Sequence, residues 1–117
     1  MTIETREGFR PALTVFMLVK SLPEWLALPG EQRRQALAQH VEPVLARYRD
    51  DVRLRFYDVE FYSAAVTDVW VWEARSHEAY QHLVEDLRDT PFWDRYFQIS
   101  NILPGVANPY GGTSQAA

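Results

Sequence analysis

The sequence predicts an α+β fold in which strands and helices follow the order βαββαβ. Three observations lead to this prediction: β-branched and aromatic runs of strand length, two stretches whose apolar residues recur at helical spacing, and a chain of 117 residues that is 47% hydrophobic. A chain of this size suits one domain with one core. The order is that of a ferredoxin-like domain, a four-stranded antiparallel sheet with both helices on one face.

The first strand is expected over residues 12–20, a run of β-branched and aromatic side chains. Residues 22–28 are expected to form a loop or a single turn. The first helix is expected over residues 31–48, where the apolar residues fall on one stripe. Pro43 interrupts that helix, and because proline lacks the N–H of an α-helical bond, we expect a bend there, beside His40.

The second half of the chain predicts a hairpin, a helix and a final strand. The second strand is expected over residues 52–63 and the third over residues 66–74, joined by a very short connection of two alanines. Ser76 is expected to cap the second helix, which ends before Pro91. The last strand is expected over residues 98–103. Each strand is therefore expected to pair antiparallel with its neighbours.

The ends of the chain are expected to lie outside this domain. Residues 1–11 form an N-terminal extension, residues 12–110 form the single ferredoxin-like domain, and residues 111–117 are rich in Gly, Ser, Gln and Ala and are expected to be disordered.

Composition excludes several classes of function. The net charge is −4, with 12 basic residues interspersed among 16 acids, which argues against nucleic acid as a partner. No apolar run approaches the ~18 residues that span a bilayer, and the acidic N-terminal residues do not resemble a secretory signal, so a cytoplasmic protein is expected. The absence of cysteine excludes disulfides and thiolate chemistry.

Acidic residues interrupt the apolar pattern of the second strand. Asp58 and Glu60 share the face that begins with apolar side chains, and a hairpin would set Glu60 opposite Asp68. Opposed carboxylates repel, which raises the pKa of one of them and provides a general acid or base. The alternative is structural, since acids near a hairpin end often face solvent or pair with arginine.

Histidines add a second source of proton transfer. His40 flanks the apolar stripe of the first helix, from which its ring could reach the acids and act as acid or base. His77 lies at the margin of the second helix, and His82 is expected to point outward. No metal-ligand spacing occurs, so no metal site is expected. Haem is the cofactor considered, with His40 or His77 as the axial ligand, but the expectation is that no cofactor is bound.

Aromatic residues make up 14% of the chain and suit a core, an interface or a pocket for a flat apolar ligand. A small aromatic molecule is therefore the expected ligand. Neither face of the sheet is cleanly polar, so we expect a homodimer in which two sheets face each other, as in a dimeric α/β barrel. The residues expected to contact the ligand are Arg55, Tyr57, Trp70, Trp72, His77 and Tyr80.

Several motifs together resemble the darcynin family of small bacterial proteins over residues 12 to 110. They include the segments 40–47, 54–60 and 87–92, together with other short matches at Ser63, Thr67-Asp68, Trp72-Glu73, Ala79-Tyr80, Tyr96-Phe97 and Ile102-Leu-Pro104. The resemblance implies no particular reaction. The architecture is more distantly similar to dimeric α/β barrel proteins, which include cofactor-free monooxygenases of aromatic polyketides in secondary metabolism, haem enzymes, cyclases and isomerases. Fold alone does not fix function.

Two functions are consistent with these observations. The first is a cofactor-independent proton-transfer, oxygenation or cyclisation step on an aromatic or polyketide-like metabolite held between sheet and helices. The catalytic residues would then be His40, Asp58, Glu60 and Asp68. The second is a noncatalytic ligand-binding or accessory homodimer, in which the same acids satisfy Arg53, Arg55 or Arg88.

Overall fold

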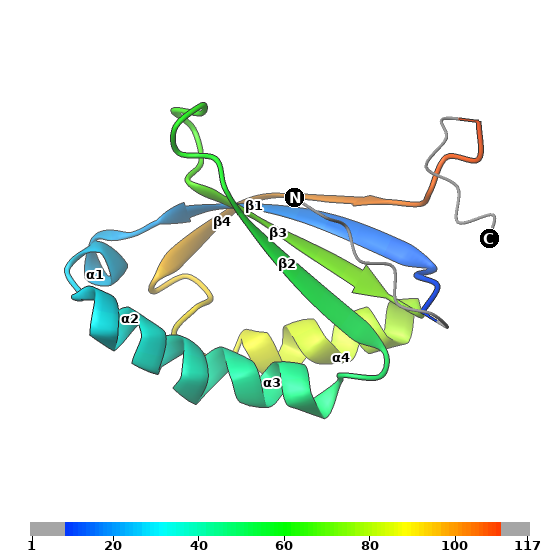
Figure 1. Ribbon diagram of the computed structural model, residues 1–117, viewed down its shortest axis with the longest axis horizontal. Helices are drawn as coiled ribbons and strands as arrows, with labels where there is room; N and C mark the ends of the chain where they lie inside the picture. The colour runs from blue at the N-terminus through cyan, green and yellow to red at the C-terminus, as the bar shows by residue number, and fades with distance from the viewer. Residues whose placement is uncertain (1–8, 111–117) are drawn as a thin grey trace.

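The computed structural model describes residues 9–110. These residues form one antiparallel sheet with helices on one face (Figure 1). Its strands lie in the order β2-β3-β1-β4. The expected α+β, ferredoxin-like fold is confirmed. The elements are β1 (Leu13–Ser21), α1 (Pro23–Leu26), α2 (Gly30–Ala36), η1 (Leu37–Val41), α3 (Glu42–Arg47), β2 (Val52–Asp58), β3 (Asp68–Ala74), α4 (His77–Leu87) and β4 (Phe97–Gly105).

Both ends of the chain extend beyond the described residues. Residues 1–8 of the expected extension and all of the expected tail, residues 111–117, lie outside the described residues. Phe9 is buried beneath the guanidinium groups of Arg53 and Arg75, at 4.3 and 5.2 Å from its ring centroid. The end of the extension therefore packs on the domain. Within residues 9–110, no helix has the length and hydropathy needed to cross a membrane.

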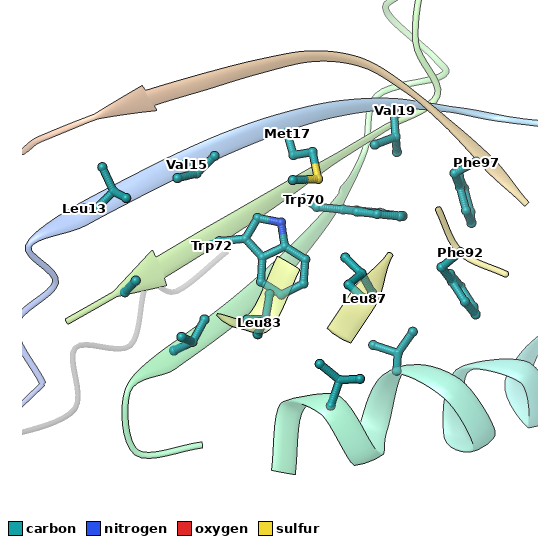
Figure 2. Packing of buried hydrophobic residues seen from close by; sticks show 14 of the residues in the cluster. Leu13, Val15, Met17, Val19, Trp70, Trp72, Leu83, Leu87, Phe92 and Phe97 are labelled. Carbon is teal, nitrogen blue, oxygen red and sulfur yellow. The ribbon is translucent and has the colours of Figure 1, made fainter. Parts of the chain in front are cut away.

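The core fills the space between the sheet and the helices, as Figure 2 shows. Alternation along β1 sends every second side chain toward the helices, and β3 contributes its two tryptophans from the same face. The helical stripe of α4 and the aromatic segment after it close the core from below. The largest fully buried side chains are Trp72, Phe92, Met17, Leu83, Leu87, Val15 and Val19.

The first long helix is continuous from Gly30 to Arg47 but widens at η1, a π turn. There the N–H of Glu42 bonds to the carbonyl oxygen of Leu37, five residues back. Pro43 follows directly and has no N–H group to donate. The wider π turn therefore occurs where a regular α-helix would lack one backbone hydrogen bond. The interruption expected beside His40 is therefore present as a π turn.

The connection between β2 and β3 differs from the expected two alanines. It comprises the nine residues from Val59 to Thr67, between Asp58 and Asp68. The Ser63 hydroxyl oxygen accepts the N–H groups of Ala65 and Val66 at 3.1 and 3.3 Å, which builds a turn inside the loop. In Figure 1 this loop stands away from the side that carries the helices. The hairpin is thus real, but its strands pair in another register.

Candidate functional site

The longer loop changes which acids oppose each other. The register pairs Asp58 with Asp68, Phe56 with Trp70 and Leu54 with Trp72. A short hairpin connection predicts Glu60 opposite Asp68, which differs from the observed register by two residues. Such a slip keeps every side chain on its expected face, because side chains alternate with period two. The acids therefore remain on the helix face, but Asp58 replaces Glu60 as the partner of Asp68.

Asp68 is the acid most affected by its surroundings. It is half-buried on the helix face between Asp58 on β2 and Val19 on β1. Burial is the main reason why the pKa of Asp68 rises to about 6; a hydrogen bond shared with Asp58, its charge and that of Glu60 also raise it, whereas a hydrogen bond from Thr67 lowers it. Asp68 is thus able to hold or release a proton near neutral pH.

Two hydroxyl groups that the sequence analysis did not propose as site residues adjoin this acid. The Thr67 hydroxyl donates to Oδ1 of Asp68 at 2.6 Å, and the Ser21 hydroxyl lies 2.8 Å from the Thr67 hydroxyl. Ser21 ends β1 and lies 46 residues from Thr67 in sequence. The Thr67-Asp68 dipeptide was a local signal for the first hydroxyl. Only strand pairing brings the second one there.

An apolar gap lies on the same face, beside the acids. Its volume is about 10 Å³, which leaves room for at most one water molecule. Phe56, whose neighbour two residues along β2 is Asp58, is 49% exposed at the gap. The lining is entirely apolar and consists of Val41, Leu54, Phe56, Trp70, Trp72, Leu87 and Phe92.

His40 lies near the gap rather than on the acids. It belongs to the π turn η1, and its ring centroid is 6.5 Å from that of Phe92. Among residues 9–110, the ring has no hydrogen bond or ion pair to Asp58 or Asp68. In this conformation Asp68 is therefore oriented by Thr67 and Asp58, without His40.

The expected ligand-contacting residues divide between the two faces of the sheet. Trp70 and Trp72 lie on the helix face and are almost wholly buried in the core. Arg55 and Tyr57 belong to the opposite face, where Arg55 donates to Glu73 at 3.1 Å. A single ligand on the helix face would therefore not contact all four.

Three further candidates lie apart from the acid pair. His77 is exposed at the start of α4, beyond the end of β3 opposite to Asp68, and six strand steps correspond to about 20 Å. Tyr80 lies one turn further along α4, and burial raises the pKa of its hydroxyl. Glu60 is exposed in the loop, where its charge still raises the pKa of Asp68. The structure thus joins Asp58 and Asp68 and separates His77 and Tyr80 from them.

The described part of the chain holds no group of three or more His, Cys, Asp or Glu side chains arranged to bind a metal ion. Chemically, Asp68 can hold a proton near neutral pH while it is hydrogen-bonded to Asp58. A carboxyl group with the raised pKa of Asp68, at the edge of an apolar surface, is suited to accept and donate a proton in turn.

Among solved structures, the chain is similar in fold to chlorite dismutases. One is a variant of the enzyme from Candidatus Nitrospira defluvii, with a TM-score of 0.70, 19% identity, and coverage of 86% of this chain but 42% of that chain. Another is a putative chlorite dismutase, TA0507, with a TM-score of 0.69, 19% identity, and coverage of 84% and 45%. This chain thus spans less than half the length of either of these proteins, and the likeness establishes the fold alone.

The expectation that no cofactor is bound is wrong. The Candidatus Nitrospira defluvii enzyme has been solved in complex with imidazole and, as a variant, in complex with cyanide. Both molecules are ligands of transition-metal centres such as haem iron. The shared fold therefore gives no support to the expected absence of a cofactor.

The apolar gap has the lining but not the volume of a haem site. Its lining is as apolar as a porphyrin face requires, and His40 is the histidine that lies near it. However, pockets for molecules of drug size enclose roughly 300–1,000 Å³, far more than the about 10 Å³ found here. The lining residues of this gap therefore do not fit a haem in the arrangement observed.

Sequence comparisons identify much closer relatives. A "Darcynin homolog" of Granulibacter bethesdensis is 58% identical over 106 residues, with coverage of 91% of this chain and 86% of the relative. A second, from Streptomyces avermitilis, is 54% identical over 107 residues, with coverage of 92% and 88%. The family model described as Darcynin, domain of unknown function, matches residues 1–116. The resemblance inferred from the motifs is confirmed, and the chain belongs to the Darcynin family.

Proposed function

We propose that this protein is a small-molecule enzyme whose chemical step is a proton transfer through Asp68. The observation that supports the proposal is the direct pairing of Asp58 with Asp68 at the edge of an apolar gap, with the pKa of Asp68 raised to about 6. A catalytic acid or base works best when its pKa lies near the working pH.

The substrate class proposed is a flat, largely apolar molecule with one group that gains or loses a proton. Phe56 offers an exposed aromatic face beside the acid pair, and Trp70 lies edge-on to it at 6.1 Å between ring centroids. The gap holds at most one water molecule, so a ligand would lie against its mouth or displace Phe56. Oxygenation through a carbanion, aldol-type cyclisation and keto–enol isomerisation each include such a step.

The contacts of the arginine side chains give less support to the noncatalytic alternative. It requires the acids to serve as partners for Arg53, Arg55 or Arg88. Arg55 binds Glu73 on the opposite face, and the guanidinium of Arg88 lies 5.7 Å from the centroid of the Trp93 ring. The raised pKa of Asp68 also differs from the lowered pKa that an ion pair with arginine produces.

A pH–rate profile separates Asp68 from His40 as the proton carrier. A substrate can be sought by mass spectrometry of small molecules that copurify with the protein, then tested for turnover. The wild type is expected to show one ionisation near pH 6. His40→Gln should retain it, and Asp58→Asn should move it to lower pH because one neighbouring negative charge is removed. Loss of the ionisation in His40→Gln alone would assign the proton to His40 and contradict the proposal.

We also propose that the active form is a homodimer in which a second copy covers the open face of the sheet. Across this face the strand pairing sets Phe16 beside Val71 and Leu103. Phe16 is 43% and Leu103 49% exposed, and in the loop after β2 Phe61 and Tyr62 are 77% and 91% exposed. Apolar side chains gathered on one side of a domain are typical of an interface.

Sedimentation at micromolar concentration tests the dimer. The wild type is expected at about twice the chain mass of 13.6 kDa, and Phe16→Glu at the mass of one chain, since a buried unpaired charge costs several kcal/mol. Ala46→Glu, at an exposed position of α3, adds the same charge away from this face and should stay dimeric. A wild type that sediments only as a single chain would refute the proposal.

A further inference from the structure

The orientation of the Asp68 carboxyl group is fixed by a hydrogen-bonded chain from β1. The Thr67 hydroxyl oxygen accepts the backbone N–H of Ser21 at 2.8 Å, which occupies one of its two lone pairs. The Ser21 hydroxyl lies at the same distance from it. A hydroxyl group has only one proton, so the direction of each bond can be worked out.

Three acceptors lie within reach of the Thr67 proton, namely Oδ1 of Asp68, the Ser21 hydroxyl oxygen at 2.8 Å and the carbonyl oxygen of Val19. Oδ1 of Asp68 lies at 2.6 Å, whereas the carbonyl oxygen of Val19 lies at 3.4 Å and already accepts the backbone N–H of Thr67 at 2.9 Å. The shorter bond to the carboxyl group is the stronger. Thr67 therefore donates to Asp68, and the Ser21 hydroxyl must donate to Thr67.

Both lone pairs of the Thr67 oxygen are then occupied by donors from Ser21. In this arrangement Thr67 has no lone pair left to accept a proton from Oδ1 of Asp68, so Oδ1 acts as an acceptor. The charged groups that face Asp68 are Asp58 and Glu60, and Asp58 also shares a hydrogen bond with Asp68.

We infer that Ser21 and Thr67 are positioning residues, which hold Oδ1 of Asp68 as an acceptor and leave its proton on Oδ2, toward Asp58 and the ligand. The catalytic consequence of this arrangement rests on the function proposed above, but the arrangement itself does not. It would leave one oxygen of the carboxyl group for exchange with substrate and prevent the proton from moving to the oxygen that faces β1.

Titration of the Asp68 carboxyl carbon by NMR tests the inference without a substrate. Thr67→Val keeps the shape of the side chain and removes the hydroxyl, so the pKa of Asp68 should rise by about one pH unit, the size expected for one lost charge-assisted hydrogen bond. Thr67→Ser should restore the wild-type titration. Ser21→Ala removes only the hydroxyl that donates to Thr67 and should give a smaller rise. Thr14→Val, on the opposite face, should give none.

The outcomes distinguish this inference from the proposed function. A wild-type pKa in folded Thr67→Val, or no rescue by serine, would overturn the inference. Should Thr67→Val fail to fold, Ser21→Ala decides: a rise in the pKa supports the chain and an unchanged pKa refutes it. A raised pKa with unchanged turnover in these variants would leave the hydrogen-bonded chain in place and count against Asp68 as the proton carrier.

Discussion

An Asp68→Asn variant is expected to lose catalysis and at the same time to gain stability above pH 6. Asparagine cannot exchange a proton, so turnover on a substrate of this protein should fall by about 10²–10⁴-fold, the usual contribution of a general acid or base. Binding should change little, because the amide has nearly the shape of the carboxyl group. Measured kcat and ligand affinity separate these effects. Unchanged kcat would show that Asp68 is not the catalytic group.

The gain in stability follows from the direction of the pKa shift. In the unfolded chain the pKa of Asp68 returns to its ordinary value of 3.8, whereas in the folded protein it is about 6. Between these values the folded protein retains a proton that the unfolded chain has lost. The free energy of unfolding therefore falls as the pH rises from about 4 to 6 and remains lower above pH 6.

The size of this effect is limited by the exposure of the carboxyl group. Two pH units would correspond to about 3 kcal/mol, and screening by solvent reduces this to about 1 kcal/mol for a half-buried group. Urea unfolding at pH 5 and pH 8 should show the decline in the wild type but not in Asp68→Asn. Asp50→Asn, at an exposed position after α3, is the matched control and should keep the decline. A decline that persists in Asp68→Asn would contradict the raised pKa.

The largest expected loss of stability is that of Trp72→Ala, at about 3–5 kcal/mol. Trp72 is 1% exposed, lines the apolar gap and stands edge-on to Trp70 at 6.5 Å between ring centroids. Truncation would remove a large buried ring and leave a cavity among side chains that cannot close it. Urea unfolding of both proteins at one pH measures the difference.

Trp72→Phe provides the control for that prediction. The indole N–H of Trp72 is buried and has no hydrogen-bond partner among the described residues. A buried unsatisfied donor destabilises the folded protein by about 1–3 kcal/mol, and phenylalanine removes it. The smaller phenylalanine ring also fills less of the core, which destabilises the folded protein. The two effects oppose each other, so Trp72→Phe should differ from the wild type by about 1 kcal/mol or less. A loss as large as that of Trp72→Ala would mean that the indole N–H has a partner.

The sequence by itself determined the order of the elements and the face on which each side chain lies. The strand alternation of β1 and β3, the helical stripes, the cap at Ser76 and the interruption at Pro43 all arise from local chemistry within a few residues. These signals have periods of 2.0 and 3.6 residues, which decide whether a side chain meets the core. They therefore placed Asp58 and Asp68 on the helix face correctly.

The tertiary structure alone decided which residues meet on that face. A slip of two residues leaves the alternation unchanged, so the pattern could not distinguish Glu60 from Asp58 as the partner of Asp68; the turn built by Ser63 and the long loop made the choice. Ser21 reached Thr67 only because β1 pairs with β3 across 46 residues. The volume of the gap also depends on how side chains from the sheet and the helices pack against each other. The periodicity of the sequence does not specify this packing.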